Sequence, residues 1–116
     1  MGLRFRDSIS GVLTAVALLA GCASTRPDPQ AQLDRAFARI QVHEAAIEHA
    51  RLTAQREDAE CAQTCAAGAS AAQEQAALCT IAREVADPDA LLRCERAARA
   101  ASGVAARGAQ RCRCSN

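Results

Sequence analysis

The sequence predicts an all-α protein: a disulfide-stapled three-helix bundle, or a helical hairpin, with one long N-terminal helix. Three observations predict this class. Alanine fills 30 of the 116 positions, and Arg, Glu and Gln are frequent, all of which favour helices. Tyr and Trp are absent and Phe occurs twice, so few residues favour strands. Seven cysteines in so short a chain indicate covalent cross-links rather than incidental thiols.

The first segment reads as an export signal. Arg4 and Arg6 give it a positive start, and the run from Ile9 to Gly21 is uncharged and mostly apolar. A membrane-spanning helix needs about 20 such residues, so this run is too short to be one. Its length is typical of the apolar region of a signal peptide.

The run closes on Leu19, Ala20, Gly21 and Cys22, and this quartet resembles the lipobox of bacterial lipoproteins. The resemblance covers only the signal and its cleavage point. It implies a diacylglycerol on the Cys22 thiol, cleavage before Cys22 by a type II signal peptidase, and acylation of the new N-terminus. Several acyl chains would anchor the protein durably, whereas a single chain is marginal.

The expected organisation follows from that motif. Residues 1–21 are a removed signal peptide, residues 22–28 a lipidated tether, and residues 29–116 a cysteine-rich helical domain. Ala23 stands where an Asp would resemble an inner-membrane retention signal, which favours the outer membrane, facing the periplasm. The alternatives are an uncleaved anchor helix, or an ordinary secretory signal in which Cys22 is coincidental.

Proline and glycine divide the helical domain. Asp28 before a proline is a helix start, and the first helix is expected from about residue 29 to 67, with Gly68 ending it. Ser70 with Gln73 matches a capping box for a second helix over about 70–86. Asp87 before a proline opens a third helix, which Gly108 ends.

A first helix of this length would outreach its partners. Leu33, Ile40 and Ile47 recur every seven residues, but the intermediate positions (Ala36, His43, Ala50 and Glu57) make a poor coiled-coil seam. We therefore expect its first half to stand as a solvated amphipathic stalk, with pairing to another chain as the alternative. The oligomeric state stays open.

Six cysteines remain once Cys22 is lipidated, an even number in an exported chain. From residue 22 onward the chain has only 12 Val, Ile, Leu and Phe residues, so disulfides are expected to support a thin core. Cys79 and Cys94 lie at matched distances from the turn at Asp87 and should pair. The remaining four should join pairwise, in an order left open: Cys61 and Cys65 with Cys112 and Cys114.

A metal site is the rival interpretation, because Cys-x-x-x-Cys with Cys-x-Cys could give zinc four thiolates. Export and the even count argue against it, and no Cys-x-x-Cys motif suggests a redox pair. His43 and His49 are six apart, on different helix faces, and are expected to be exposed rather than joint ligands. No cofactor is expected.

The sequence contains no Ser/His/Asp grouping, phosphate-binding glycine loop or aromatic platform, and the net charge is only +1. We therefore expect neither an enzyme nor a nucleic-acid binder.

The chain uses arginine and no lysine, and arginine suits carboxylate or phosphate contacts. An anionic envelope glycan or lipid head group is therefore one expected ligand; the alternative explanation is codon bias without a ligand. Six arginines near the C-terminus are expected to form a basic end of the domain: Arg93, Arg96, Arg99, Arg107, Arg111 and Arg113.

The expected function is that of a small membrane-anchored lipoprotein of the bacterial cell envelope. It would bind or scaffold an envelope partner without catalysis, held to the membrane by lipid on Cys22. The alternative is an inhibitor or immunity-like protein that blocks an envelope enzyme through its rigid head.

Overall fold

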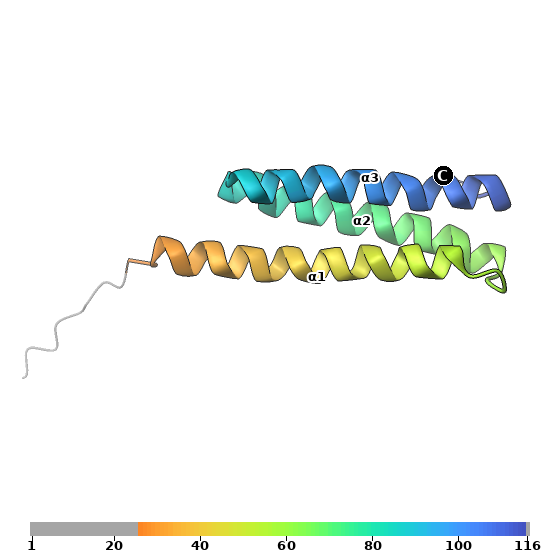
Figure 1. The fold of residues 1–116 in the computed structure, drawn as a ribbon, viewed down its shortest axis with the longest axis horizontal. Coiled ribbons are helices and arrows are strands. Elements are labelled where there is room, and N and C mark those ends of the chain that lie inside the picture. Colours follow the sequence, from red (N-terminus) through yellow and green to blue (C-terminus); the bar gives the residue numbers. More distant parts are fainter. Residues whose placement is uncertain (1–25, 116) are drawn as a thin grey trace, which may run out of the picture.

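The computed structural model describes residues 26–115 as three consecutive helices: α1 (Pro29–Gln55), α2 (Cys61–Val85) and α3 (Pro88–Arg111). They lie side by side along one axis and alternate in direction (Figure 1). The α1–α2 turn lies at one end of the bundle, and the α2–α3 turn lies at the other. The predicted all-α three-helix bundle is thus confirmed.

The helix starts predicted from Asp-Pro pairs are correct. The Asp28 carboxylate accepts a hydrogen bond from the Gln30 amide at 3.0 Å, and Asp87 accepts from the Asp89 and Ala90 amides at 2.9 and 3.2 Å. These bonds satisfy amides that have no partner within the first helical turn. The α2–α3 turn is closed by Ala86, whose φ of 52° is left-handed.

The N-terminal helix is the longest of the three, but its predicted extent is wrong, because α1 ends at Gln55 rather than near residue 67. The three helices are of similar length, with 27, 25 and 24 residues. The chain turns over residues 56–60, where an Arg56–Asp58 ion pair forms. Gln63 then accepts a hydrogen bond from the Glu60 amide at 3.3 Å, so the second helix begins nine residues before the predicted Ser70.

Gly68 and Gly108 do not end helices; both are buried inside them. A Cβ on Gly68 would lie 3.5 Å from the Ala105 Cα, and one on Gly108 would lie 3.3 Å from the Cys114 sulfur. Their small size therefore permits α2 and α3 to approach closely, and α3 continues to Arg111.

The core changes in character along the bundle. Toward the α2–α3 turn it contains large residues, including Ile40, Ile47, Leu78 and Ile81. Toward the α1–α2 turn the buried apolar cluster is alanine except for one valine, and Thr64 and the disulfide-bonded Cys112 are buried at the same end. The members of this cluster are Ala50, Ala54, Ala67, Ala71, Ala101 and Val104. Alanine buries little area, so this second end gains less from the hydrophobic effect.

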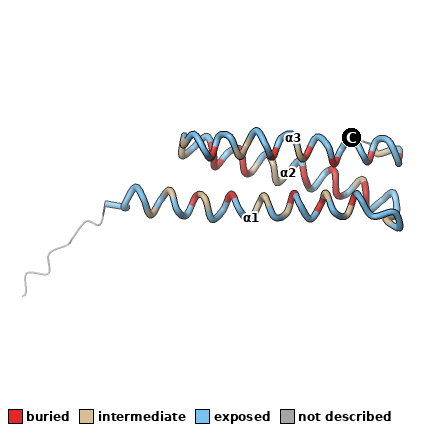
Figure 2. The backbone as a smooth tube through the Cα atoms, in the orientation of Figure 1, coloured by how far each residue is buried: buried red, intermediate tan, exposed pale blue. Residues whose placement is uncertain are grey.

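The predicted stalk is also wrong. The seven-residue repeat of α1 is buried at Ile40 and Ile47, with Ala36 and Ala54 beside it. Buried positions follow α1 along its length, on the side that meets α2 and α3 (Figure 2). The apolar face of α1 thus packs on its own chain.

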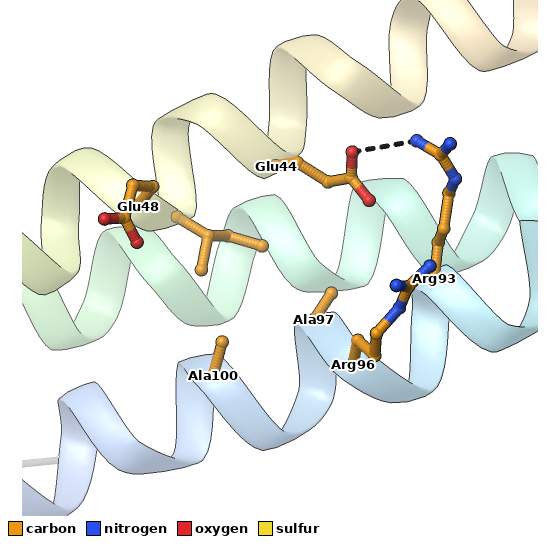
Figure 3. Close-up of a pocket in the computed structure, with 7 residues that line it drawn as sticks. Glu44, Glu48, Arg93, Arg96, Ala97 and Ala100 are labelled. Atoms are coloured by element: carbon orange, nitrogen blue, oxygen red, sulfur yellow. Dashed lines mark hydrogen bonds and ion pairs between the residues drawn. The ribbon is translucent and has the colours of Figure 1, made fainter.

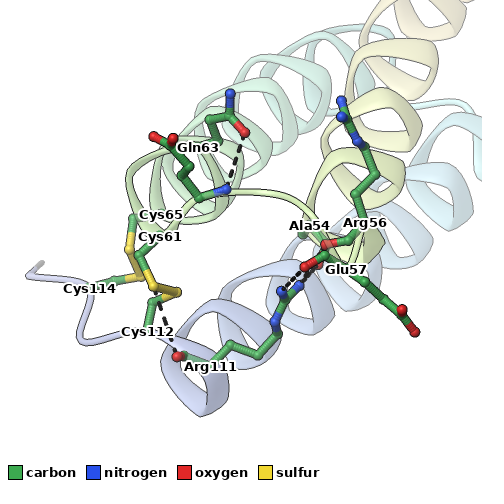
Figure 4. The surroundings of a disulfide bond; sticks show 10 residues. Ala54, Arg56, Glu57, Cys61, Gln63, Cys65, Arg111, Cys112 and Cys114 are labelled. Atoms are coloured by element: carbon green, nitrogen blue, oxygen red, sulfur yellow. Dashed lines mark hydrogen bonds between the residues drawn. A yellow bond between two sulfur atoms is a disulfide. The ribbon is translucent and has the colours of Figure 1, made fainter.

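Three disulfides form: Cys61–Cys112, Cys65–Cys114 and Cys79–Cys94. The predicted Cys79–Cys94 pair is confirmed, and the order left open for the other four is now defined. All three bridges connect α2 with α3 or with the residues directly after it, and none involves α1. Two of them lie at the end whose core is almost entirely alanine (Figure 4).

Candidate functional site

A groove lies between α1 and α3. Two adjoining cavities of about 370 and 240 Å³ share Ala100 and make the groove continuous. Figure 3 shows side chains of both helices along the larger cavity. The charged residues that line the whole groove are Glu44, Glu48, Arg51, Arg93, Arg96, Arg99 and Arg107.

The half of the groove nearer the α2–α3 turn is internally neutralised around Arg93. Its guanidinium donates to Asp89 at 3.0 Å and across the groove to Glu44 at 3.1 Å, as Figure 3 shows for Glu44. It also lies 5.2 Å from the centre of the Phe37 ring. The hydrogen bond to Asp89, followed by the charge of Glu44, raises the pKa of Arg93. Arg93 therefore serves mainly to hold α1 against α3.

The other half, which we call the cationic half, is lined by Arg51, Arg99 and Arg107 and by no acidic residue. Arg51 donates to Glu48 of the neighbouring half, at 2.7 Å from its Nε, and this hydrogen bond lowers the pKa of Glu48. Arg99 and Arg107 make no ion pair or side-chain hydrogen bond with any residue in 26–115. The cationic half thus carries uncompensated positive charge.

Arg111 has a structural role instead. It donates to the carbonyl oxygens of Ala54, Arg56 and Glu57 at 3.2, 2.9 and 3.2 Å (Figure 4). Carbonyls at a helix C-terminus lack partners within the helix, so Arg111 of α3 caps the end of α1. The C-terminal arginines therefore do not form a single basic end.

The two histidines differ in their surroundings. His43 is half-buried, and its Nδ1 lies 2.6 Å from the Glu74 carboxylate of α2, so the expectation of an exposed side chain is wrong for this residue. His49 is exposed, as expected. Across the described range, no group of three or more His, Cys, Asp or Glu side chains is arranged to hold a metal ion. The four cysteines of the rival zinc interpretation form two disulfides.

The predicted lipidation site, Cys22, lies outside the described residues, as do Leu19, Ala20 and Gly21 of the cleavage motif. Of the helices formed within residues 26–115, none is both long and apolar enough to cross a membrane.

No protein-family model matches the chain, and neither the curated proteins nor the solved structures contain a significant match.

Proposed function

We propose that the chain is a lipid-anchored protein of the bacterial cell envelope whose helical domain binds or scaffolds an envelope partner without catalysis. One observation carries the proposal: all six cysteines of the helical domain form disulfides. Disulfides persist in oxidising compartments outside the cytoplasm. The seventh cysteine, Cys22, is the one in the motif that resembles a lipobox.

The geometry supports a tethered spacer. The anchoring segment would enter the domain at Pro29, the start of α1, and the 27 residues of α1 extend about 40 Å along the bundle. The α1–α2 turn and two disulfides lie at the far end. A domain with this shape and cross-linking would hold the groove away from the membrane surface.

The groove itself favours binding over acid–base chemistry. Its two carboxylates are paired, Glu44 with Arg93 and Glu48 with Arg51. A general acid or base must reach a substrate proton, and both carboxylates are already held by arginine side chains. The unpaired groups in the groove are arginines, which recognise anions and do not exchange protons.

The anchor is tested by expressing the full chain in a Gram-negative host and measuring the intact mass of the purified product. We expect a protein that begins at Cys22 and carries a diacylglyceryl and an acyl group, recovered in the outer-membrane fraction. Cys22→Ser should abolish both the cleavage and the lipid, whereas the matched variant Ser24→Ala should leave both intact. A product that retains residues 1–21, or one cleaved without lipid, would contradict the anchor.

The binding role is tested separately by cross-linking in intact cells, followed by purification in detergent. We expect a partner recovered in stoichiometric amount. Recovery of an envelope hydrolase whose activity falls when the domain is added would instead establish inhibition and overturn the scaffolding role.

A further inference from the structure

We propose that the cationic half of the α1–α3 groove is a binding site for a soluble polyanion, an acidic glycan that carries repeated carboxylate or phosphate groups. The site itself follows from the described structure. The choice of a soluble ligand over a lipid head group rests on the proposed membrane anchor.

The first argument is the segregation of charge. From residue 22 onward the chain has twelve arginines and twelve acidic residues, so the helical domain is neutral overall. The groove nevertheless contains five of those arginines and only two glutamates, and Asp89, which does not line it, pairs with Arg93 and Arg96 at 3.0 and 3.9 Å. A neutral domain thus leaves uncompensated positive charge in the cationic half of the groove, which attracts anions and raises their local concentration.

The second argument is the availability of donors. Arg93 and Arg111 donate hydrogen bonds to groups of the protein itself. Arg99 and Arg107 have no ion-pair or side-chain hydrogen-bond partner among residues 26–115. Glu48 occupies the Nε and Nη2 atoms of Arg51 and leaves Nη1 without a partner in the same range. A guanidinium presents a planar fork that fits carboxylate and phosphate oxygens.

The third argument is shape. Small residues, among them Ala54, Ala100 and Gly103, line the cationic half. A Cβ built on Gly103 would meet no atom within 4 Å, so the space beside the α3 backbone is open at that position. Arg99 and Arg107 are eight residues apart on α3, about 12 Å along the helix axis. That spacing suits an extended chain of acidic groups better than a single small anion.

The position of the cationic half favours a ligand beyond the membrane. Arg51 lies 22 residues from Pro29, about 33 Å along α1 from the point where the tether joins. An anchored domain would present it to the space between the membranes rather than to its own lipid head groups.

A nucleic acid is disfavoured as the polyanion. Tyr and Trp are absent from the chain, so nucleic-acid bases have no ring of those types to stack on.

The experiment uses the processed, disulfide-bonded protein in vesicles of phosphatidylcholine. Oligogalacturonate is the carboxylate probe, polyphosphate the phosphate probe and a maltooligosaccharide the uncharged reference, each titrated by calorimetry at 150 mM salt, about the physiological ionic strength. The test variant is Arg99→Gln/Arg107→Gln. The control is Arg39→Gln/Arg83→Gln, which removes the same charge from exposed positions outside the groove.

We expect at least one polyanion to bind and the reference to fail. The groove variant should weaken binding roughly tenfold or more, and the control less than about twofold, with unchanged circular dichroism. Absence of binding by both polyanions, or equal weakening in both variants, would overturn the site.

Lipid head groups are tested in a further arm. Clustering of the protein-bearing vesicles with vesicles of phosphatidylglycerol, without binding of either soluble polyanion, would overturn the choice of a soluble ligand. The intact-mass measurement decides the anchor independently, so failure of the site and failure of the proposed function can be told apart.

Discussion

The α2–α3 hairpin and α1 are attached to the bundle in different ways. Three disulfides join α2 to α3 and its C-terminal extension, and the small residues Gly68 and Gly108 let these helices approach closely. Among residues 26–115, no disulfide joins α1 to another helix. The docking of α1 depends on the buried Ile40 and Ile47 and on polar contacts that Arg93, Glu74 and Arg111 make with it.

This difference shows how an alanine-rich domain compensates for a thin core. Large apolar residues gather at the end of the bundle that has one disulfide, and alanines fill the end that has two. The groove has one wall on α1 and the other on α3, so its shape requires the non-covalent docking of α1. The α2–α3 hairpin should therefore stay folded under conditions that detach α1, and the polyanion binding that we propose for the groove should be lost first.

The largest effect should follow reduction. In the chain-entropy model the Cys79–Cys94 loop contributes about 3 kcal/mol, and each of the two longer loops about 4 kcal/mol. The three loops overlap and do not add fully, but their combined loss is comparable with the typical stability of about 5–15 kcal/mol of a domain, so the reduced protein should lose most of its helicity at 37 °C. Circular dichroism with and without reductant checks this; coincident melting curves would show that the disulfides are dispensable.

A core substitution in α1 should have the next largest effect. Ile40 is fully buried, so Ile40→Ala should lower the free energy of unfolding by about 2–5 kcal/mol. Val42 on the same helix is 67% exposed, and Val42→Ala should change stability by less than about 0.5 kcal/mol. Urea unfolding of both variants gives the comparison. Equal losses in the free energy of unfolding would show that Ile40 does not belong to the core.

Removal of the inter-helix cap should be milder. Arg111→Ala deprives three carbonyl oxygens at the end of α1 of a charged donor and should cost about 1–3 kcal/mol. Arg113→Ala, two residues on at an exposed position, should cost less than about 0.5 kcal/mol. Thermal unfolding of the oxidised proteins measures both effects. An Arg111 variant as stable as its control would mean that water donates hydrogen bonds to these carbonyl oxygens as well as Arg111 does.

The smallest effect should come from pH. Hydrogen bonds from Arg51 and Arg56 lower the pKa values of Glu48 and Asp58 in the folded protein. The resulting stability is present above the ordinary carboxyl values of about 4 and is lost as pH falls through the lowered ones. Acid should thus loosen α1 and its turn slightly, and Glu48→Gln/Asp58→Asn should flatten the melting temperature over that range. A variant that retained the full wild-type acid dependence would assign it to other carboxylates.

The Cys79–Cys94 pair was predictable even though one helix boundary was misplaced, whereas the order of the other four cysteines was left open. Measured from the turn at Asp87, Cys79 lies eight residues before and Cys94 seven after, and Cys61 lies 26 before and Cys112 25 after. Cys65 lies 22 before and Cys114 27 after, so this pair departs from equal distances, and Cys114 lies beyond the end of α3. Helices that run in opposite directions bring residues at equal distances from their turn to the same height. This rule is unaffected by where α1 ends.

The end of α1 and the groove were not predictable in the same way. Residues 56–60 contain no glycine or proline, and only their run of charged residues indicates a turn. Gly68 was predicted to end a helix, because the sequence alone does not show that this glycine packs against Ala105 of α3. The groove forms only where α1 packs against α3, and this packing could not be predicted because the end of α1 was misplaced. The arginines that line the groove on α3 were identified from the sequence.

Native-state hydrogen exchange of the oxidised protein tests the central claim most directly. If α1 is docked only by side-chain contacts on a covalently joined hairpin, the amides of residues 33–55 should exchange through a partial opening. Its free energy should be lower than that measured for residues 65–85 and 92–111, and Ile40→Ala should lower both values by a similar amount because it destabilises the native state from which both openings start. Equal protection of all three helices would contradict the claim and show one cooperative unit.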